Sequence, residues 1–198
     1  MASDVRVPPT QITGIQGALI KRVARKRLGE VPEPLGVMWH NLPVLKAFFG
    51  FMSKAERWDA CDTRLKSFAH MAVASAVGCG FCLDLGYFQA NDSGLDLDKA
   101  REVPRWRESD AFTPLEREVM AYAEAMTHTP PTVTDAIAAR LREQLGAAGL
   151  VELTAFIGAA NLVSRSNTAL GIEPQGFSAA CGLPPLAEPA TPHHDVAS

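Results

Sequence analysis

The sequence predicts an all-α protein. Apolar residues recur at three- and four-residue spacing along almost the whole chain, whereas the alternating pattern typical of strands is nearly absent. Capping residues and helix-ending glycines divide this pattern into separate helical segments. The 198 residues suffice for one domain, or two small ones, with a substantial core.

The capping signals place each helix in turn. Asn41, followed by Pro43, is expected to open one helix, and Asp62 or Thr63 the next. Thr113-Pro114-Leu115-Glu116 is a capping box with proline at the first helical position. The predicted helices cover about residues 15–28, 42–55, 63–77, 79–90 and 114–127. Thr132 or Thr134 is expected to cap a further helix that ends near Gly146, and Gly149 or Leu150 to begin a long helix that ends at Gly171.

Other segments are expected to be less regular. Residues 31–36 contain two prolines and are predicted to be a connector, and residues 95–109 are polar, with Trp106 expected to pack against the body. We divide the chain into an N-terminal arm and helix (1–28), a main helical domain (29–175) and a Pro- and Ala-rich tail (176–198) that we expect to be disordered.

Charge and hydropathy exclude several classes of function. The net charge of −3 and the pI of about 5.9 give no support for nucleic-acid binding. No uninterrupted apolar stretch approaches the roughly 20 residues of a membrane-spanning helix, so no membrane association is expected. The first eleven residues lack a signal-peptide pattern, and we therefore expect a cytoplasmic protein.

The motif that carries chemistry is Gly78-Cys79-Gly80-Phe81-Cys82, between an Ala-rich helix and the start of another. Two cysteines three residues apart can open and close a disulfide. The free N–H groups and macrodipole of a helix N-terminus favour the thiolate, which attacks peroxides and disulfides. In a cytosolic protein such a pair is more often redox-active or metal-binding than structural.

The remaining cysteines, Cys61 and Cys181, have no partner nearby in the sequence and are predicted to be free thiols. A zinc site would have to gather three separate segments, and no second CxxC or close histidine pair in the body of the chain favours one. The sequence therefore predicts neither a metal nor a cofactor.

Three stretches together resemble the carboxymuconolactone decarboxylase and alkylhydroperoxidase D-like (AhpD-like) superfamily, over about residues 28–175. The first is Gly78 to Leu85 after its Ala-rich helix, and the second runs from Phe112 to Met126. The third begins at Leu150 and includes Asn161, Arg165-Ser166-Asn167 and Leu170-Gly171-Ile172-Glu173-Pro174.

The resemblance implies an all-helical fold that assembles into dimers, trimers or hexamers. For the CxxC branch it also implies a thiol peroxidase, in which Cys82 attacks a peroxide and becomes a sulfenic acid. Cys79 then condenses with that sulfenic acid to form a disulfide. A dithiol donor or a partner protein is implied as the reductant.

The chain departs from the superfamily's pattern at two positions. The pattern has a relay glutamate twelve residues before the first cysteine and a relay histidine four residues after the second, where this chain has Ser67 and Gly86. His70, one turn after Ser67, is the candidate substitute base. The predicted catalytic residues are therefore Cys82, Cys79 and His70, and we expect slow peroxide reduction because a general base contributes about 10²- to 10⁴-fold.

Further polar residues have structural interpretations. Asp84 is expected to be an anion at a helix N-terminus or an ion-pair partner, and Tyr87 to be structural. Asn161 and Asn167 are expected to satisfy helix ends or subunit contacts, whereas Glu152 and Arg165 could pair across an interface.

Two further functions are compatible with the sequence. The chain could be an acid-base enzyme on a carbon acid, like the lactone decarboxylase branch, with His40, His70 or His128 as base. It could also be a non-enzymatic oligomeric helical protein whose CxxC is vestigial, structural or a redox sensor. An acid-base enzyme would survive replacement of both cysteines, and a sensor would change assembly or partner binding without turnover.

Overall fold

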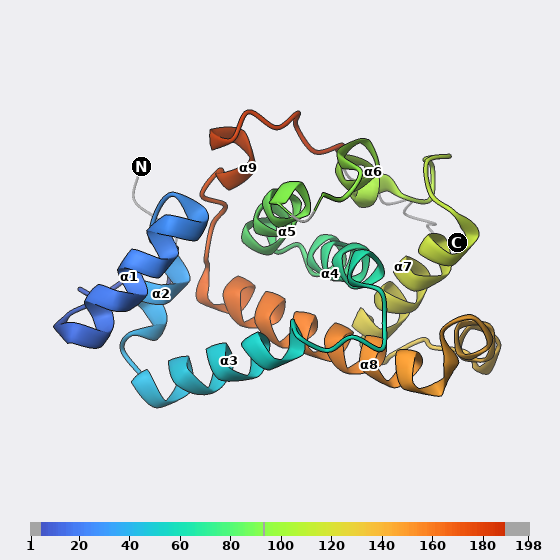
Figure 1. The fold of residues 1–198 in the computed structure, drawn as a ribbon, viewed down its shortest axis with the longest axis horizontal. Coiled ribbons are helices and arrows are strands. Elements are labelled where there is room, and N and C mark those ends of the chain that lie inside the picture. The colour runs from blue at the N-terminus through green and yellow to red at the C-terminus, as the bar shows by residue number, and fades with distance from the viewer. Residues whose placement is uncertain (1–4, 93, 189–198) are drawn as a thin grey trace, which may run out of the picture.

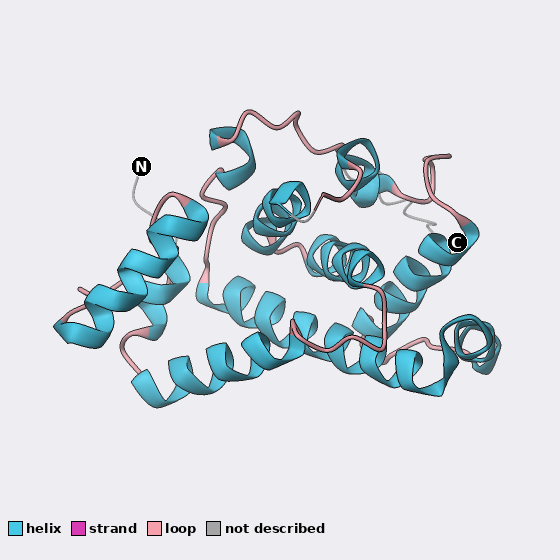
Figure 2. Cartoon of the chain, in the orientation of Figure 1, coloured by secondary structure: helices cyan, strands magenta, loops and turns pink. Residues whose placement is uncertain are grey.

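The structure, a computed structural model, describes residues 5–92 and 94–188 of the chain. Within these residues it contains helices, turns and loops but no strand (Figure 2). The prediction of an all-α fold is confirmed.

The centre of the fold is α4 (Thr63–Val77), which packs against α5 (Gly80–Asp92), α7 (Pro114–Thr127) and α8 (Asp135–Leu170) (Figure 1). Its large side chains Phe68, Met71 and Val73 are fully buried. The small residues between them, among them Ala69 and Ala72, let the neighbouring helices approach closely. The helix that precedes the CxxC motif is therefore enclosed on most of its surface.

The predicted helix starts agree with the observed ones. Asp62 caps α4, its carboxylate accepting a bond from the Arg64 N–H at 2.8 Å, and Asn41 caps α3 (Leu42–Ala55) through the Val44 N–H. Thr113 and Glu116 form the complete capping box of α7.

The longest helix, α8, combines the two helices predicted on either side of Gly146. Thr134 caps its start, and Gly146, at φ 72° and ψ 172°, interrupts the helical backbone. By length and composition alone α8 could cross a membrane, but this is weak evidence. The break at Gly146 and the packing of α8 on α4 and α7 are typical of a helix in a globular fold.

Lys66 and Glu152 join α4 to α8 by a buried ion pair. The two charged groups lie 2.7 Å apart, with side chains only 2% and 7% exposed. The Lys66 ammonium also donates to the Trp58 carbonyl, and the Glu152 carboxylate accepts from the Ala60 N–H at 2.7 Å. Both charges are thus compensated inside the protein, and they also fix the loop before α4.

Two segments predicted to be irregular contain short helices. Residues 31–36 are not only a connector, because Pro34 stands in the first turn of α2 (Glu33–Met38), where proline is tolerated. The polar segment 95–109 forms α6 (Leu97–Glu102), capped by Asp96, and a 3₁₀ turn, η1 (Val103–Arg105). Trp106 is buried, as predicted.

The start of the tail is ordered, contrary to the prediction of disorder from residue 176. It forms α9 (Phe177–Ala180), which packs on α5, and the Ala187 N–H then donates to the Arg101 carbonyl of α6 at 2.9 Å. Apolar Phe177, Leu183 and Leu186 hold this stretch on the body, a contribution that the high proline content obscured. Residues 189–198 lie outside the described residues.

The N-terminal helices lie on one side of the molecule (Figure 1). α1 (Gly14–Leu28), α2 and α3 share a small apolar cluster of Ile12, Ala24, Leu35 and Leu45. The Arg6 guanidinium donates to the carbonyls of Thr168 and Ala169, which ties the N-terminal arm to the end of α8.

Candidate active site

Cys79 and Cys82 lie at the N-terminal end of α5. Gly78 ends α4 in the left-handed conformation, at φ 77° and ψ 26°, and so allows the chain to turn sharply into the motif. The Cys79 N–H bonds back to the Ala74 carbonyl at 2.8 Å. Both cysteines are thiols in the structure, and each is only 2% exposed.

Polar groups from two helices surround the two sulfur atoms. The Cys82 N–H donates to Cys79 Sγ at 3.3 Å, and the Asn167 amide of α8 donates to Cys82 Sγ at 3.4 Å. Ser164, one turn before Asn167, is fully buried. Donors from α5 and α8 therefore converge on the CxxC pair.

The environment shifts the pKa values of the two thiols in opposite directions. Hydrogen bonding with Cys79 lowers the pKa of Cys82, whereas burial raises it. His70, through its hydrogen bonding and its charge, lowers this pKa further, and so does the hydroxyl of Ser164. The bond with Cys82 and then burial raise the pKa of Cys79. This arrangement favours a Cys82 thiolate beside a Cys79 thiol.

His70, the predicted substitute base, reaches this site from α4. Its hydrogen bonding and charge act on the Cys82 thiol, and its ring packs against Gly86 on the opposing helix. Ser67 on the same helix donates its hydroxyl to the Thr63 carbonyl at 3.0 Å, so that hydroxyl is bonded to its own helix. His70 thus lies beside Cys82, and its role as base stays a prediction.

A covering segment, residues 172–178, lies over the CxxC turn. The Pro174 ring sits on Gly80, where an added Cβ would come within 2.7 Å of Pro174 Cγ; no larger residue fits there without a shift. Ile172 and Phe177 share an apolar cluster with both cysteines, and the ring of Phe177 meets that of Phe81 edge-on at 5.9 Å.

Asp84 holds the covering segment in place. Its buried carboxylate accepts bonds from the backbone N–H groups of Phe177 and Ser178 at 2.8 and 3.1 Å, at the start of α9. The expectation of an anion at a helix N-terminus is confirmed, although the helix is α9 and not the one that carries Asp84. Tyr87 is fully buried, in keeping with a structural role.

The other polar residues of α8 bond within the chain. Glu152 pairs with Lys66, so the suggested pairing with Arg165 across an interface is wrong. Arg165 bonds to the Thr127 carbonyl and to Asn161 Oδ1, and the Asn161 amide bonds to Thr127 Oγ1 at 3.0 Å.

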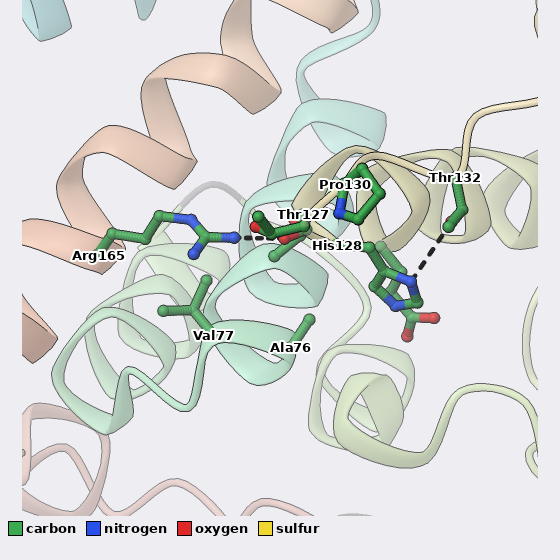
Figure 3. A pocket seen from close by; sticks show the side chains of 9 residues that line it. Ala76, Val77, Thr127, His128, Pro130, Thr132 and Arg165 are labelled. Atoms are coloured by element: carbon green, nitrogen blue, oxygen red, sulfur yellow. Dashed lines mark hydrogen bonds between the residues drawn. The ribbon is translucent and has the colours of Figure 1, made fainter.

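Arg165 also borders an open cleft of about 620 Å³ between the ends of α4 and α7 and the C-terminal part of α8 (Figure 3). Ala76 and Val77 of α4 form one wall, and His128 lies on the far side, bonded to Thr132 at 3.4 Å. The cysteines do not line this cleft.

The three histidines considered as bases occupy separate places. His40, between α2 and α3, bonds to the Pro8 carbonyl at 3.0 Å, and His128 caps the C-terminus of α7. Only His70 of the three influences the cysteines. Within residues 5–92 and 94–188 no three His, Cys, Asp or Glu side chains are grouped as a metal site would require.

Two residues of this site were missed in the sequence, Ser164 and Thr168, which influence Cys82 and Cys79 respectively. Asn167 was expected only as a capping or subunit residue. Their spacing of three and four residues places Ser164, Asn167 and Thr168 on one face of α8. The sequence shows that shared face but not which helix it meets.

Comparisons with known proteins identify the family of this chain. The model of the carboxymuconolactone decarboxylase family matches residues 43–125. The uncharacterized protein YnjA of Escherichia coli (strain K12) is 34% identical over 164 residues, which span 81% of this chain and 87% of YnjA.

Solved structures share the fold. A cysteine-to-alanine variant of the debrominase Bmp8, in complex with 2,3,4-tribromopyrrole, matches with a TM-score of 0.78 and 22% identity, covering 89% of this chain and 95% of Bmp8. An AhpD-core, peroxidase-related protein from Ralstonia eutropha JMP134 matches with a TM-score of 0.69 and 18% identity, covering 86% of this chain and 94% of that one. At these identities the likeness concerns the fold alone.

Proposed function

We propose that this chain, which belongs to the carboxymuconolactone decarboxylase family, is a thiol-dependent oxidoreductase that reduces peroxides with Cys82 and Cys79. The observation that carries the proposal is the geometry of the buried CxxC pair: the Cys82 N–H donates to Cys79 Sγ at 3.3 Å, and the Asn167 amide donates to Cys82 Sγ at 3.4 Å. The directions of the two thiol pKa shifts agree with it. A nucleophile must be a thiolate, and its partner must keep a proton to give away.

The reaction takes two electrons from the cysteine pair. The Cys82 thiolate attacks the outer oxygen of the peroxide, the O–O bond breaks, and the alkoxide or hydroxide leaves with one proton. Cys82 is then a sulfenic acid. The Cys79 sulfur attacks it, the S–O bond breaks, and the hydroxyl group leaves as water with the Cys79 proton. A dithiol reductant returns two electrons and two protons to the disulfide.

His70 is the proposed source of the proton for the leaving oxygen. Both its hydrogen bonding and its charge favour the Cys82 thiolate. A histidine titrates near neutral pH and can both stabilise the thiolate and pass on a proton. It would take over from α4 the function that the resemblance assigns to a histidine on α5.

The test is consumption of an alkyl hydroperoxide by the reduced protein with a dithiol reductant. We expect turnover by the wild type and its loss in Cys82→Ser. Cys181→Ser, which removes an exposed cysteine outside the site, is the matched control and should keep full activity. Unchanged peroxide consumption in Cys82→Ser would overturn the proposal.

Carbon-bound bromine is a second candidate electrophile, because the debrominase Bmp8 shares this fold over nearly its full length. The same cysteine pair would supply both electrons. The thiolate takes the bromine, the ring carbon takes a proton, and Cys79 then displaces bromide to form the disulfide. Bromide release from a bromopyrrole that depends on Cys82, without peroxide consumption, would favour this substrate class.

An acid-base enzyme and a redox sensor would give different results in these assays. An acid-base enzyme on a carbon acid keeps its activity when both cysteines are replaced. A redox sensor forms the disulfide but does not turn over with a dithiol reductant, and its assembly or partner binding changes instead.

The proposed assembly is a homo-oligomer. Apolar side chains are exposed on α3 and α8, namely Val44, Phe49, Phe51, Val151 and Leu162, of which Val151 is 69% exposed. Burying them in a second copy would remove this apolar surface from water. Sedimentation equilibrium should give a mass of at least two chains, and a monomer at all concentrations would contradict the assembly.

A further inference from the structure

Ser164 of α8 has a buried hydroxyl that bonds to no backbone or side-chain oxygen or nitrogen among the described residues. The residue is fully buried. An alanine would fill nearly the same space without the penalty of an unpaired polar atom. The hydroxyl therefore points to a role other than packing.

The position of Ser164 points to the Cys82 sulfur. Asn167 stands three residues later on α8, and its amide donates to Cys82 Sγ at 3.4 Å. Residues three apart lie on the same face of a helix, so the Ser164 hydroxyl faces the same region of α5. A hydroxyl can rotate its proton toward an acceptor, and a buried thiolate is a strong one.

We propose that Ser164 is a positioning residue that, together with Asn167, holds the Cys82 sulfur as a thiolate by donating hydrogen bonds from α8. The redox role of that thiolate rests on the proposed function, but the hydrogen bonds themselves do not. Two neutral donors stabilise the anion without a further charged group. They would compensate in part for the relay residues that Ser67 and Gly86 replace.

The groups that face Cys82 are few. His70 comes from α4 and Cys79 from the turn before α5, and both are ionisable. Ser164 and Asn167 come from α8, and both are neutral. A change in the titration of Cys82 on replacing Ser164 therefore reports the loss of a neutral donor.

The experiment measures the pH dependence of Cys82 alkylation in the reduced full-length protein, with each modified cysteine identified by peptide mass spectrometry. In Ser164→Ala we expect the midpoint to rise by roughly one pH unit, which is about tenfold less thiolate below the midpoint. At a pH below the midpoint, where Cys82 keeps its proton, thermal stability should stay close to that of the wild type, because alanine fills nearly the same space. Ser164→Thr keeps the hydroxyl and should keep the midpoint.

Ser166→Ala, two residues away on α8, is the matched control and should behave as the wild type. The same alkylation midpoint in Ser164→Ala and the wild type would overturn the inference, whether or not the variant is less stable. A protein that ignores peroxide, yet shows the rise in Ser164→Ala, would refute the proposed function and support the inference about Ser164.

Discussion

The imidazole of His70 on α4 packs directly against Gly86 on α5. A Cβ added to Gly86 would lie 3.2 Å from His70 Nδ1 and 3.1 Å from Met71 Cγ, closer than ordinary van der Waals contact. Position 86 is where the superfamily's pattern has a histidine, one turn after Cys82. The glycine thus makes room for an imidazole that arrives from the neighbouring helix.

Moving the histidine from position 70 to position 86 tests whether the imidazole can act from either helix. His70→Ala should lower the rate of peroxide consumption by about 10²-fold or more, because a general acid or base is lost. Gly86→His alone should not raise the rate, since its side chain meets His70 and Met71. The double variant His70→Ala/Gly86→His should recover part of the lost rate, because the space is then free.

His128→Ala is the control, since that exposed histidine lies at the end of α7. A double variant no faster than His70→Ala would show that the site does not accept the exchange. A wild-type rate in His70→Ala would refute the role of His70.

The lowered pKa of Cys82 makes the stability of the reduced protein depend on pH. In the unfolded chain this thiol keeps its proton up to about pH 8.5, whereas in the folded protein it loses the proton at lower pH. The unfolded state binds more protons between these two values, so stability rises with pH across that window. The contribution is complete above about pH 8.5 and is lost as the pH falls through the folded-state pKa.

The measurement is the free energy of unfolding of the wild type minus that of Cys82→Ser, from denaturant titrations over a series of pH values with a reductant present. Groups that do not interact with Cys82 cancel in this difference. A difference that is flat between about pH 5 and 9 would be incompatible with a thiolate at Cys82.

Removal of one partner from the buried Lys66–Glu152 pair should strongly destabilise the fold. Lys66→Met leaves the Glu152 carboxylate buried without its cation, at a cost of about 3–5 kcal/mol. Lys66→Met/Glu152→Leu removes both charges and should recover much of that loss. Arg64→Ala, at an exposed ion pair with Asp62, should have little effect. Equal effects of Lys66→Met and Arg64→Ala in denaturant titrations would contradict the role of this pair.

Loosening the covering segment should expose the cysteines. Asp84→Ala removes the acceptor for two N–H groups at the start of α9, and we expect faster alkylation of Cys82 by a bulky maleimide at a pH where its thiolate is fully formed. Asp96→Ala removes the cap of α6 and should leave that rate unchanged. Equal rates in the two variants would show that the segment does not limit access.

Much of the helical framework follows from local signals. Asn41, Asp62 and Thr113 each bond to backbone N–H groups a few residues away, so their effect can be predicted from the sequence. Such signals say nothing about long-range packing. The prediction for the start of the proline-rich tail was wrong because its order depends on long-range contacts. These are the packing of Phe177, Leu183 and Leu186 on the body and the bond to Asp84, more than ninety residues before Phe177.

In the candidate site, too, local signals were predicted from the sequence and long-range contacts were not. Cys79 and Cys82 are recognisable because their spacing is itself the signal, and His70 because it shares a helix face with the position of the expected glutamate. Ser164 and Asn167 were not assigned to the site, because only the packing of α8 brings them to Cys82, 85 residues from Asn167.

The most direct test of the central claim, that Cys82 is the nucleophile and Cys79 its partner, is a single turnover with one equivalent of hydroperoxide. In Cys79→Ser, which lacks the second thiol, we expect a sulfenic acid on Cys82, trapped by dimedone and located by mass spectrometry. In Cys82→Ser we expect Cys79 to stay unmodified. Dimedone adducts on Cys79 in Cys82→Ser, with none on Cys82 in Cys79→Ser, would contradict these roles.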